Sequence, residues 1–461
     1  MRKILFLLIV IVLIAMAIRT FKKEKIDMLL INGTILTMNE KKEIITSGVI
    51  AIKDNKIIDV GSKGLEEKYS AKKIIDANEG IIMPGMVNTH THASMSVFRS
   101  LADDVPDRLS RYIFPLEKKM VSREMVYIGA IHGSIEMVKS GVTTMTDMYY
   151  FEDEVAKAVK KIGMRGILGE TVIKFPVADA PKPFGGIEYA EKFIQEYKND
   201  ELITPAFAPH APQTNDTEHL KIISELSEKY NVPVLMHVAE TEKESEYFKE
   251  KYNMTPVKYL ESIGALNKRF VAAHLIFVND EDIDILKRND VGIAHNMVAN
   301  IKSAKGISPA LKMYNQGLRV GLGTDGPMSG NTLDIIGQMG YVAKMHKLDN
   351  RDRSALPPNI AVEMATIGGA KALHMEDKIG SLEIGKFADI VIVETNSVNM
   401  VPMYDPYSAL VYSANASNVE TVIINGKIIV EDKKLKTYDE VKSKKDMNKF
   451  KEKVIEIAKT L

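Results

Sequence analysis

Two histidines stand one residue apart in the stretch PGMVNTHTH, at His90 and His92, directly after an apolar run. In a β-strand, residues i and i+2 point to the same side, so both imidazoles can reach one ion. A lone pair of this kind is weak evidence, because two histidines that only hydrogen-bond have the same spacing. Donor residues at matching places elsewhere in the chain would favour a metal.

Such donors follow five later apolar runs. They are His210, His237, His274, His295 and Asp325. Imidazole and carboxylate ligands suit Zn²⁺ or Fe²⁺. A divalent ion with an open coordination position lowers the pKa of a bound water to near neutrality and so provides a nucleophile. The pattern predicts a hydrolytic centre with a bound divalent metal, most simply Zn²⁺, with Fe²⁺ as the alternative.

The apolar runs also predict the fold. Between residues 81 and 375, eight short runs alternate with amphipathic helical patterns such as 216–230. The runs are continuously apolar, as expected for strands buried on both faces. We therefore predict an α/β protein with a (β/α)8 TIM-type barrel over 81–375, whose site lies at the carboxyl ends of the strands.

The flanking parts of the chain are rich in β-branched residues. Segments 26–80 and 376–435 contain strand patterns punctuated by turns such as Asn32-Gly33 and Asn425-Gly426. We predict that both segments form one small composite β-sandwich domain, built from the two ends of the chain. Residues 436–461 are predicted to form a C-terminal helix.

The first 25 residues are predicted to form a hydrophobic anchor or signal segment. An uncharged apolar run from Ile4 to Ile18 has basic residues on both sides. The run is slightly shorter than the roughly 17–25 residues that span a bilayer, and a signal peptide has a similar pattern. We expect an uncleaved N-terminal membrane anchor, with secretion after cleavage or a cytoplasmic protein as alternatives.

Composition excludes several classes of protein. The chain has no cysteine, which rules out disulfides, thiolate zinc sites and the deaminases whose zinc is held by a P-C-x-x-C motif. The 61 basic residues balance the 61 acidic residues, so no basic excess indicates a nucleic-acid partner. Any metal must be held by His, Asp or Glu.

Four motifs, PGMVNTHTH, HVAET, AHL and GLGTDGP, occur in an order that resembles the amidohydrolase superfamily. The branch that it most resembles is the 5′-methylthioadenosine/S-adenosylhomocysteine deaminase group, over about residues 26–435. The resemblance implies that the metal ligands are His90, His92, His237 and Asp325. Binuclear members carry a carboxylated lysine where this chain has His210, so the resemblance favours a single ion.

The same resemblance implies the remaining roles. Glu240 would protonate the purine ring nitrogen, Asp325 would accept a proton from the attacking water, and His274 would orient that water. His210 and Glu117 would contact the nucleoside, with Glu117 at the ribose hydroxyls. The implied reaction converts a 5′-modified adenosine into its inosine analogue and ammonia, a task for which two separated carboxylates are suited.

Some features depart from the family pattern. The third-strand stretch GILGETVIKF has Glu170 and Thr171 and no arginine for a carboxylate-bearing tail, and Met297 and Ala299 replace the usual Pro and Ser.

Another aminated or chlorinated ring as substrate, such as a guanine-like base or a triazine, is the second hypothesis. A third is an inactive, membrane-tethered binding protein, and a homo-oligomer is compatible with all three. The remaining histidines are expected to be surface or packing residues: His132, His219, His346 and His374.

Overall fold

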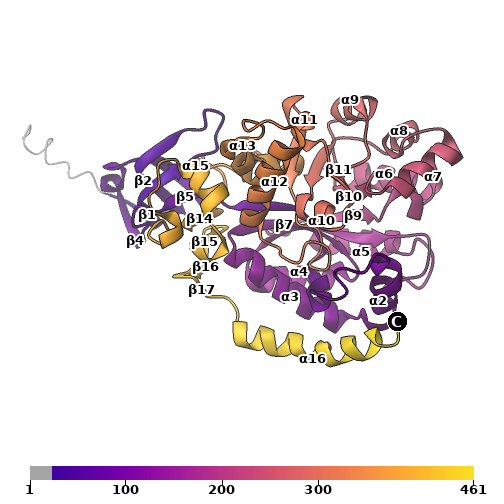
Figure 1. Ribbon diagram of the computed structural model, residues 1–461. Helices are drawn as coiled ribbons and strands as arrows, with labels where there is room; N and C mark the ends of the chain where they lie inside the picture. The colour runs from indigo at the N-terminus through magenta and orange to yellow at the C-terminus, as the bar shows by residue number, and fades with distance from the viewer. Residues whose placement is uncertain (1–22) are drawn as a thin grey trace, which may run out of the picture.

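The computed structural model describes residues 23–461, in which a barrel lies beside a smaller sheet domain (Figure 1). Within this range, no helix is both long enough and apolar enough to cross a bilayer. The anchor or signal segment predicted from the first residues lies almost wholly outside the described range and stays a prediction.

Eight parallel strands form the barrel in chain order. They are β6 (Met86–Thr91), β7 (Val142–Tyr149), β8 (Arg165–Val172), β9 (Ile203–Pro209), β10 (Val234–Val238), β11 (Phe270–His274), β12 (Gly292–His295) and β13 (Arg319–Leu322). Every residue of β7 and β8 is buried, as the continuous apolar runs predicted. The first and last strands meet where the backbone amides of Thr324 and Asp325 donate to His90 O at 3.1 and 3.0 Å. The (β/α)8 prediction is confirmed.

Helices cover the outside of the barrel (Figure 1). They are α2 (Phe114–Met120), α3 (Arg123–Lys139), α4 (Glu152–Ile162), α5 (Gly186–Tyr197), α6 (Thr217–Tyr230), α7 (Glu242–Tyr252), α8 (Pro256–Ser262), α9 (Asp280–Arg288), α10 (Met297–Lys302), α11 (Ala310–Asn315), α12 (Ile335–Asp349), α13 (Pro358–Glu363) and α14 (Gly369–Ala372). Side-chain caps begin several of them: Asp216 accepts from the His219 amide at 2.9 Å, and Thr241 accepts from the Glu244 amide at 3.2 Å.

The smaller domain is a nine-stranded mixed sheet built from both ends of the chain, as predicted. Its strands are β1 (Glu24–Leu36), β2 (Ile44–Lys53), β3 (Lys56–Ser62), β4 (Tyr69–Asp76), β5 (Ile81–Pro84), β14 (Ile390–Val393), β15 (Val419–Ile424), β16 (Lys427–Glu431) and β17 (Lys434–Leu435). The two ends join where β5 pairs antiparallel with β14, with Ile82 opposite Ile392. Both side chains lie in a buried aliphatic core with Leu30 and Ile50.

A buried ion pair links the two domains. Arg165 of β8 donates from Nε and Nη2 to the carboxylate of Asp389, at 3.1 and 3.3 Å, and the residues are 2% and 4% exposed.

Below the barrel, the last helix, α16 (Glu440–Ala458), runs along α3 toward α2 (Figure 1). The short helix α15 (Pro406–Ser408) completes the loop between β14 and β15.

Candidate metal centre and active site

The barrel delivers the predicted donor residues to one rim. His90 lies in β6 and His92 directly follows it, His237 lies in β10, and His274 and His295 end β11 and β12. Asp325 follows β13 shortly after its end, and His210 directly follows β9. The carboxyl ends of parallel strands share one edge, so residues distant in the chain become neighbours.

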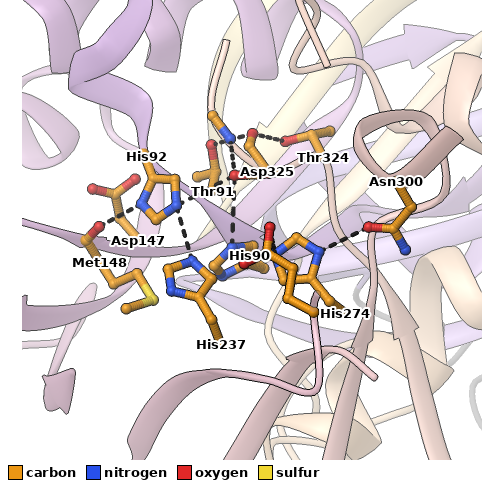
Figure 2. A network of polar contacts seen from close by, with 12 residues as sticks. His90, Thr91, His92, Asp147, Met148, His237, His274, Asn300, Thr324 and Asp325 are labelled. Carbon is orange, nitrogen blue, oxygen red and sulfur yellow. Dashed lines mark hydrogen bonds and ion pairs between the residues drawn. The ribbon is translucent and has the colours of Figure 1, made fainter. Parts of the chain in front are cut away.

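Four of these side chains converge on one point (Figure 2). His92 Nε2 lies 3.3 Å from Asp325 Oδ1 and 3.3 Å from His237 Nε2, and His90 Nε2 lies 3.8 Å from Asp325 Oδ1. The ring centroids of His90 and His237 are 4.9 Å apart. The structure thus brings His90, His92, His237 and Asp325 together, as the resemblance implied.

Hydrogen bonds on the far side of each ring orient the imidazoles. His92 Nδ1 donates to Met148 O at 2.6 Å, and His237 Nδ1 donates to His210 O at 2.8 Å. His274 Nδ1 donates to Asn300 Oδ1 at 2.8 Å. A proton held on Nδ1 leaves Nε2 as a lone pair that faces the cluster, which is the tautomer that a metal ligand needs.

The donor set fits a divalent cation. Among residues 23–461, the buried His90 Nε2 has no hydrogen-bond partner although it points into the cluster. Burial and the neighbouring imidazoles hold the pKa values of His90 and His237 well below the ordinary range, so both rings are neutral. Burial opposes ionisation of both Asp325 and His92, but the hydrogen bond between them lowers the pKa of Asp325 and raises the pKa of His92 to about 9. Metal binding at this site would therefore release the His92 proton. Neutral imidazoles and an ionised carboxylate are the forms that bind metal.

The backbone at the rim is held in uncommon conformations. Ala239, His274 and Asp325 all have left-handed backbone, with φ of 51°, 76° and 59°. Local bonds hold Asp325: Thr91 Oγ1 donates to its carbonyl at 3.1 Å, and the Gly326 amide donates to Oδ1 at 2.6 Å. Left-handed non-glycine residues gather at functional sites, where the surrounding fold imposes the conformation.

Glu240 lies next to this cluster as a second carboxylate. Its Oε1 contacts the Lys305 ammonium and lies 3.8 Å from His274 Nε2. Burial would raise the pKa of Glu240, but the electrostatic interactions with His274 and Lys305 lower it to about 2, so the carboxylate is ionised. Sequence reasoning missed Lys305 because lysines are common in surface loops and no motif marked this one. Asn300, which orients His274, was also missed, because no motif marked it.

The two predicted substrate contacts lie around the same cluster. His210 packs edge-on against His237, with ring centroids 5.0 Å apart, and burial lowers its pKa to about 4. Burial raises the pKa of Glu117, on α2, to about 7. Interactions with Tyr149 and His92 act in the opposite direction, which shows that Glu117 lies near these two residues. The structure thus brings a neutral imidazole and a carboxyl group near the metal centre.

His295 is the strand-end histidine that does not join the cluster. It is fully buried, and its Nε2 lies 3.2 Å from Nε2 of His346, which is also buried. The other histidines fit the packing interpretation: His132 Nδ1 hydrogen-bonds Ser443 Oγ at 2.9 Å, and His219 stacks on Phe184. Within residues 23–461, the metal-ligand geometry is confined to His90, His92, His237, His274 and Asp325.

A closed parallel barrel with imidazoles and carboxylates at its carboxyl rim defines a metal-dependent (β/α)8 hydrolase. Comparison with known proteins agrees. The model of the amidohydrolase family matches residues 81–429. A 5-methylthioadenosine/S-adenosylhomocysteine deaminase of Thermodesulfovibrio yellowstonii is 41% identical, over 86% of this chain and 91% of the relative. A 5′-deoxyadenosine deaminase of Methanosarcina barkeri is 37% identical, over 93% and 98%.

A solved structure extends the likeness to three dimensions. An adenosine deaminase of Xanthomonas campestris with bound zinc superposes with a TM-score of 0.92 at 28% identity, covering 94% of this chain and 99% of its own. The chain therefore belongs to the amidohydrolase family, and within it to the group of 5-methylthioadenosine/S-adenosylhomocysteine deaminases.

Proposed function

We propose that the protein hydrolytically deaminates an adenine nucleoside with a modified 5′ position, giving the inosine analogue and ammonia. The observation that carries the proposal is the presence of two separate carboxylates beside the imidazole cluster, Asp325 against His92 and Glu240 against His274. Replacing an amino group by oxygen needs an activated water and two proton transfers, which two carboxylates can divide. The names of the relatives support the same reaction.

In this proposal, His90, His92, His237 and Asp325 hold one divalent cation. Zn²⁺ suits a site of three imidazoles and one carboxylate, and Fe²⁺ accepts the same ligands. The zinc bound in the Xanthomonas relative favours Zn²⁺. When bound, the cation supplies an acidified water as the nucleophile.

The proton transfers fall to the side chains. Asp325 accepts a proton from the attacking water through the carboxylate oxygen that is not held by the Gly326 amide. Asn300 fixes the Nδ1 proton of His274, so Nε2 can accept a hydrogen bond and orient the water. Glu240, which is ionised in the free protein, takes up the second proton of the water and supplies it to the ring nitrogen beside the attacked carbon. The proton accepted by Asp325 then passes to the leaving amino group, which departs as ammonia.

The nucleoside would be held by residues that line the rim. We propose that the Glu117 carboxyl group accepts hydrogen bonds from the ribose hydroxyls and that the neutral His210 ring contacts the purine. In β8, the third strand of the barrel, Glu170 and Thr171 are both buried, and neither side chain is a cation that could pair with a carboxylate-bearing 5′ tail. This supports uncharged 5′ groups, such as methylthio or hydrogen, over the amino-acid tail of S-adenosylhomocysteine.

One assay tests the proposal. Purified protein of known metal content is mixed with 5′-methylthioadenosine, 5′-deoxyadenosine, S-adenosylhomocysteine and adenosine, and the adenine-to-hypoxanthine absorbance change is followed. We expect turnover, with kcat/KM highest for the two uncharged 5′-modified nucleosides. Metal-loaded protein that converts none of the four would contradict the proposed function, and a preference for S-adenosylhomocysteine would contradict the proposed 5′ specificity alone.

A further inference from the structure

Lys305 contacts the carboxylate that the proposed reaction uses as its acid. Its ammonium donates to Glu240 Oε1, the same oxygen that lies 3.8 Å from His274 Nε2. From residue 23 to the C-terminus, no side chain or backbone group of the structure hydrogen-bonds to the other oxygen, Oε2. The carboxylate is therefore engaged on one side and open on the other.

The loop that carries Lys305 has a shape that fixes where its side chain begins. The Lys305 amide donates to Asn300 O at 3.0 Å, just after α10. The residues on either side, Ala304 and Gly306, have φ of 52° and 128°, so the chain reverses sharply at this place. The Lys305 side chain is 30% exposed, and its contact with Glu240 shows that the ammonium points into the site.

The backbone of Glu240 is held from the opposite direction. The amides of Ala239 and Glu240 donate to the two carboxylate oxygens of Glu244, each at 2.9 Å. These bonds fix the Cα position of Glu240 but leave its side-chain torsions free. The direction of the carboxylate is therefore decided by its own contacts, of which the ion pair with Lys305 is the shortest.

We propose that Lys305 is a positioning residue that holds Oε1 of Glu240 and leaves Oε2 to carry the proton to the purine ring nitrogen. An ammonium has three donors and no acceptor, so the carboxylate oxygen that it contacts binds a proton less readily than the other oxygen does. The positive charge also favours the ionised carboxylate, so a proton on Glu240 is given up more readily. The inference rests on the proposed deamination.

The experiment compares Lys305→Met, which keeps the length of the side chain and removes its charge, with Lys305→Arg, which keeps the charge. Lys312→Met is the matched control, since Lys312, on α11, forms an exposed ion pair with Asp280 of α9. Metal content and melting temperature are measured for each variant. We expect Lys305→Met to lower kcat about 10- to 100-fold, with KM changed less than about threefold and full metal content. Lys305→Arg should restore most of kcat, and the control should match the wild type.

A double variant separates positioning from an independent role. If Lys305 acts only through Glu240, then Lys305→Met made in a Glu240→Gln background should lower kcat no further. An additional loss there would overturn the proposal, as would a rise in KM with unchanged kcat, which would mean that Lys305 binds the substrate. If Lys305→Met does not fold, Lys305→Gln replaces it with the same expected results.

Failure of this inference is distinguishable from failure of the proposed function. Wild-type protein that is inactive on every nucleoside would contradict the deamination itself and the inference with it. Active wild type together with a Lys305→Met variant of unchanged kcat would overturn only the role of Lys305.

Discussion

His92 Nε2 lies 3.3 Å from Asp325 Oδ1, although these residues follow the first and last strands of the barrel. The two strands are neighbours only because the sheet closes into a barrel. At this closure, the backbone amides of Thr324 and Asp325 donate hydrogen bonds to His90 O. The candidate metal centre therefore forms only in the folded barrel, and metal binding should stabilise that fold.

The first prediction concerns Asp325, which both completes the cluster and accepts a proton in the proposed reaction. Asp325→Ala should lose bound metal and reduce kcat/KM by at least about 10³-fold, since it removes a ligand and a base together. Elemental analysis and the deamination assay measure the two effects. Asp280→Ala, at an exposed position on α9, is the control and should change neither. Full metal occupancy in Asp325→Ala would show that the ligand assignment is wrong.

Glu240 should separate chemistry from metal binding. Glu240→Gln keeps the shape of the side chain but cannot carry the shuttled proton, so kcat should fall by about 10²- to 10⁴-fold with metal content unchanged. Glu250→Gln, on the exposed side of the adjacent helix α7, provides the control. If Glu240→Gln retained most of its turnover, another group would have to be the acid.

A pH-dependent effect on stability is expected from Glu170. Burial and the negative charge of Asp179 raise the pKa of Glu170 well above its ordinary value of 4.5. The folded protein therefore keeps a proton that the unfolded chain loses above about pH 4.5. The wild type should lose up to about 1.4 kcal/mol of unfolding free energy for each pH unit between the unfolded and folded pKa values.

Glu170→Gln removes this loss, so its stability relative to the wild type should increase as the pH rises. Urea unfolding at pH 5 and pH 8 measures the difference. The control, Glu188→Gln on α5, replaces an exposed residue paired with Lys192 and should stay within about 0.5 kcal/mol of the wild type at both pH values. A gain for Glu170→Gln that is equal at pH 5 and pH 8 would argue against a buried protonated carboxyl.

The ion pair between the domains should matter for stability and not for chemistry. Arg165→Met leaves the buried Asp389 carboxylate without its charged partner, which should lower the unfolding free energy by about 3–5 kcal/mol. Arg288→Met breaks an exposed pair with Glu261 and should cost at most about 1 kcal/mol. Denaturant titration compares the variants. Equal midpoints for Arg165→Met and the wild type would mean that the pair does not hold the domains together.

The sequence by itself determined the barrel and the identity of its donor residues. The continuous apolar runs of β7 and β8 are a local pattern, and a His or Asp after such a run must lie at a strand end. The order of the motifs around His90, His237, His274 and Asp325 then indicated the family. These features depend on residues close together in the chain, so they could be read without a structure.

Only the tertiary structure decided which strand-end residues meet. It placed His295 against His346 and outside the cluster, although its sequence context matches that of His274. It also brought Lys305 onto Glu240 and buried Glu170 beside Asp179. Such contacts join segments far apart in the chain, and they depend on barrel closure and loop reversals that have no local pattern.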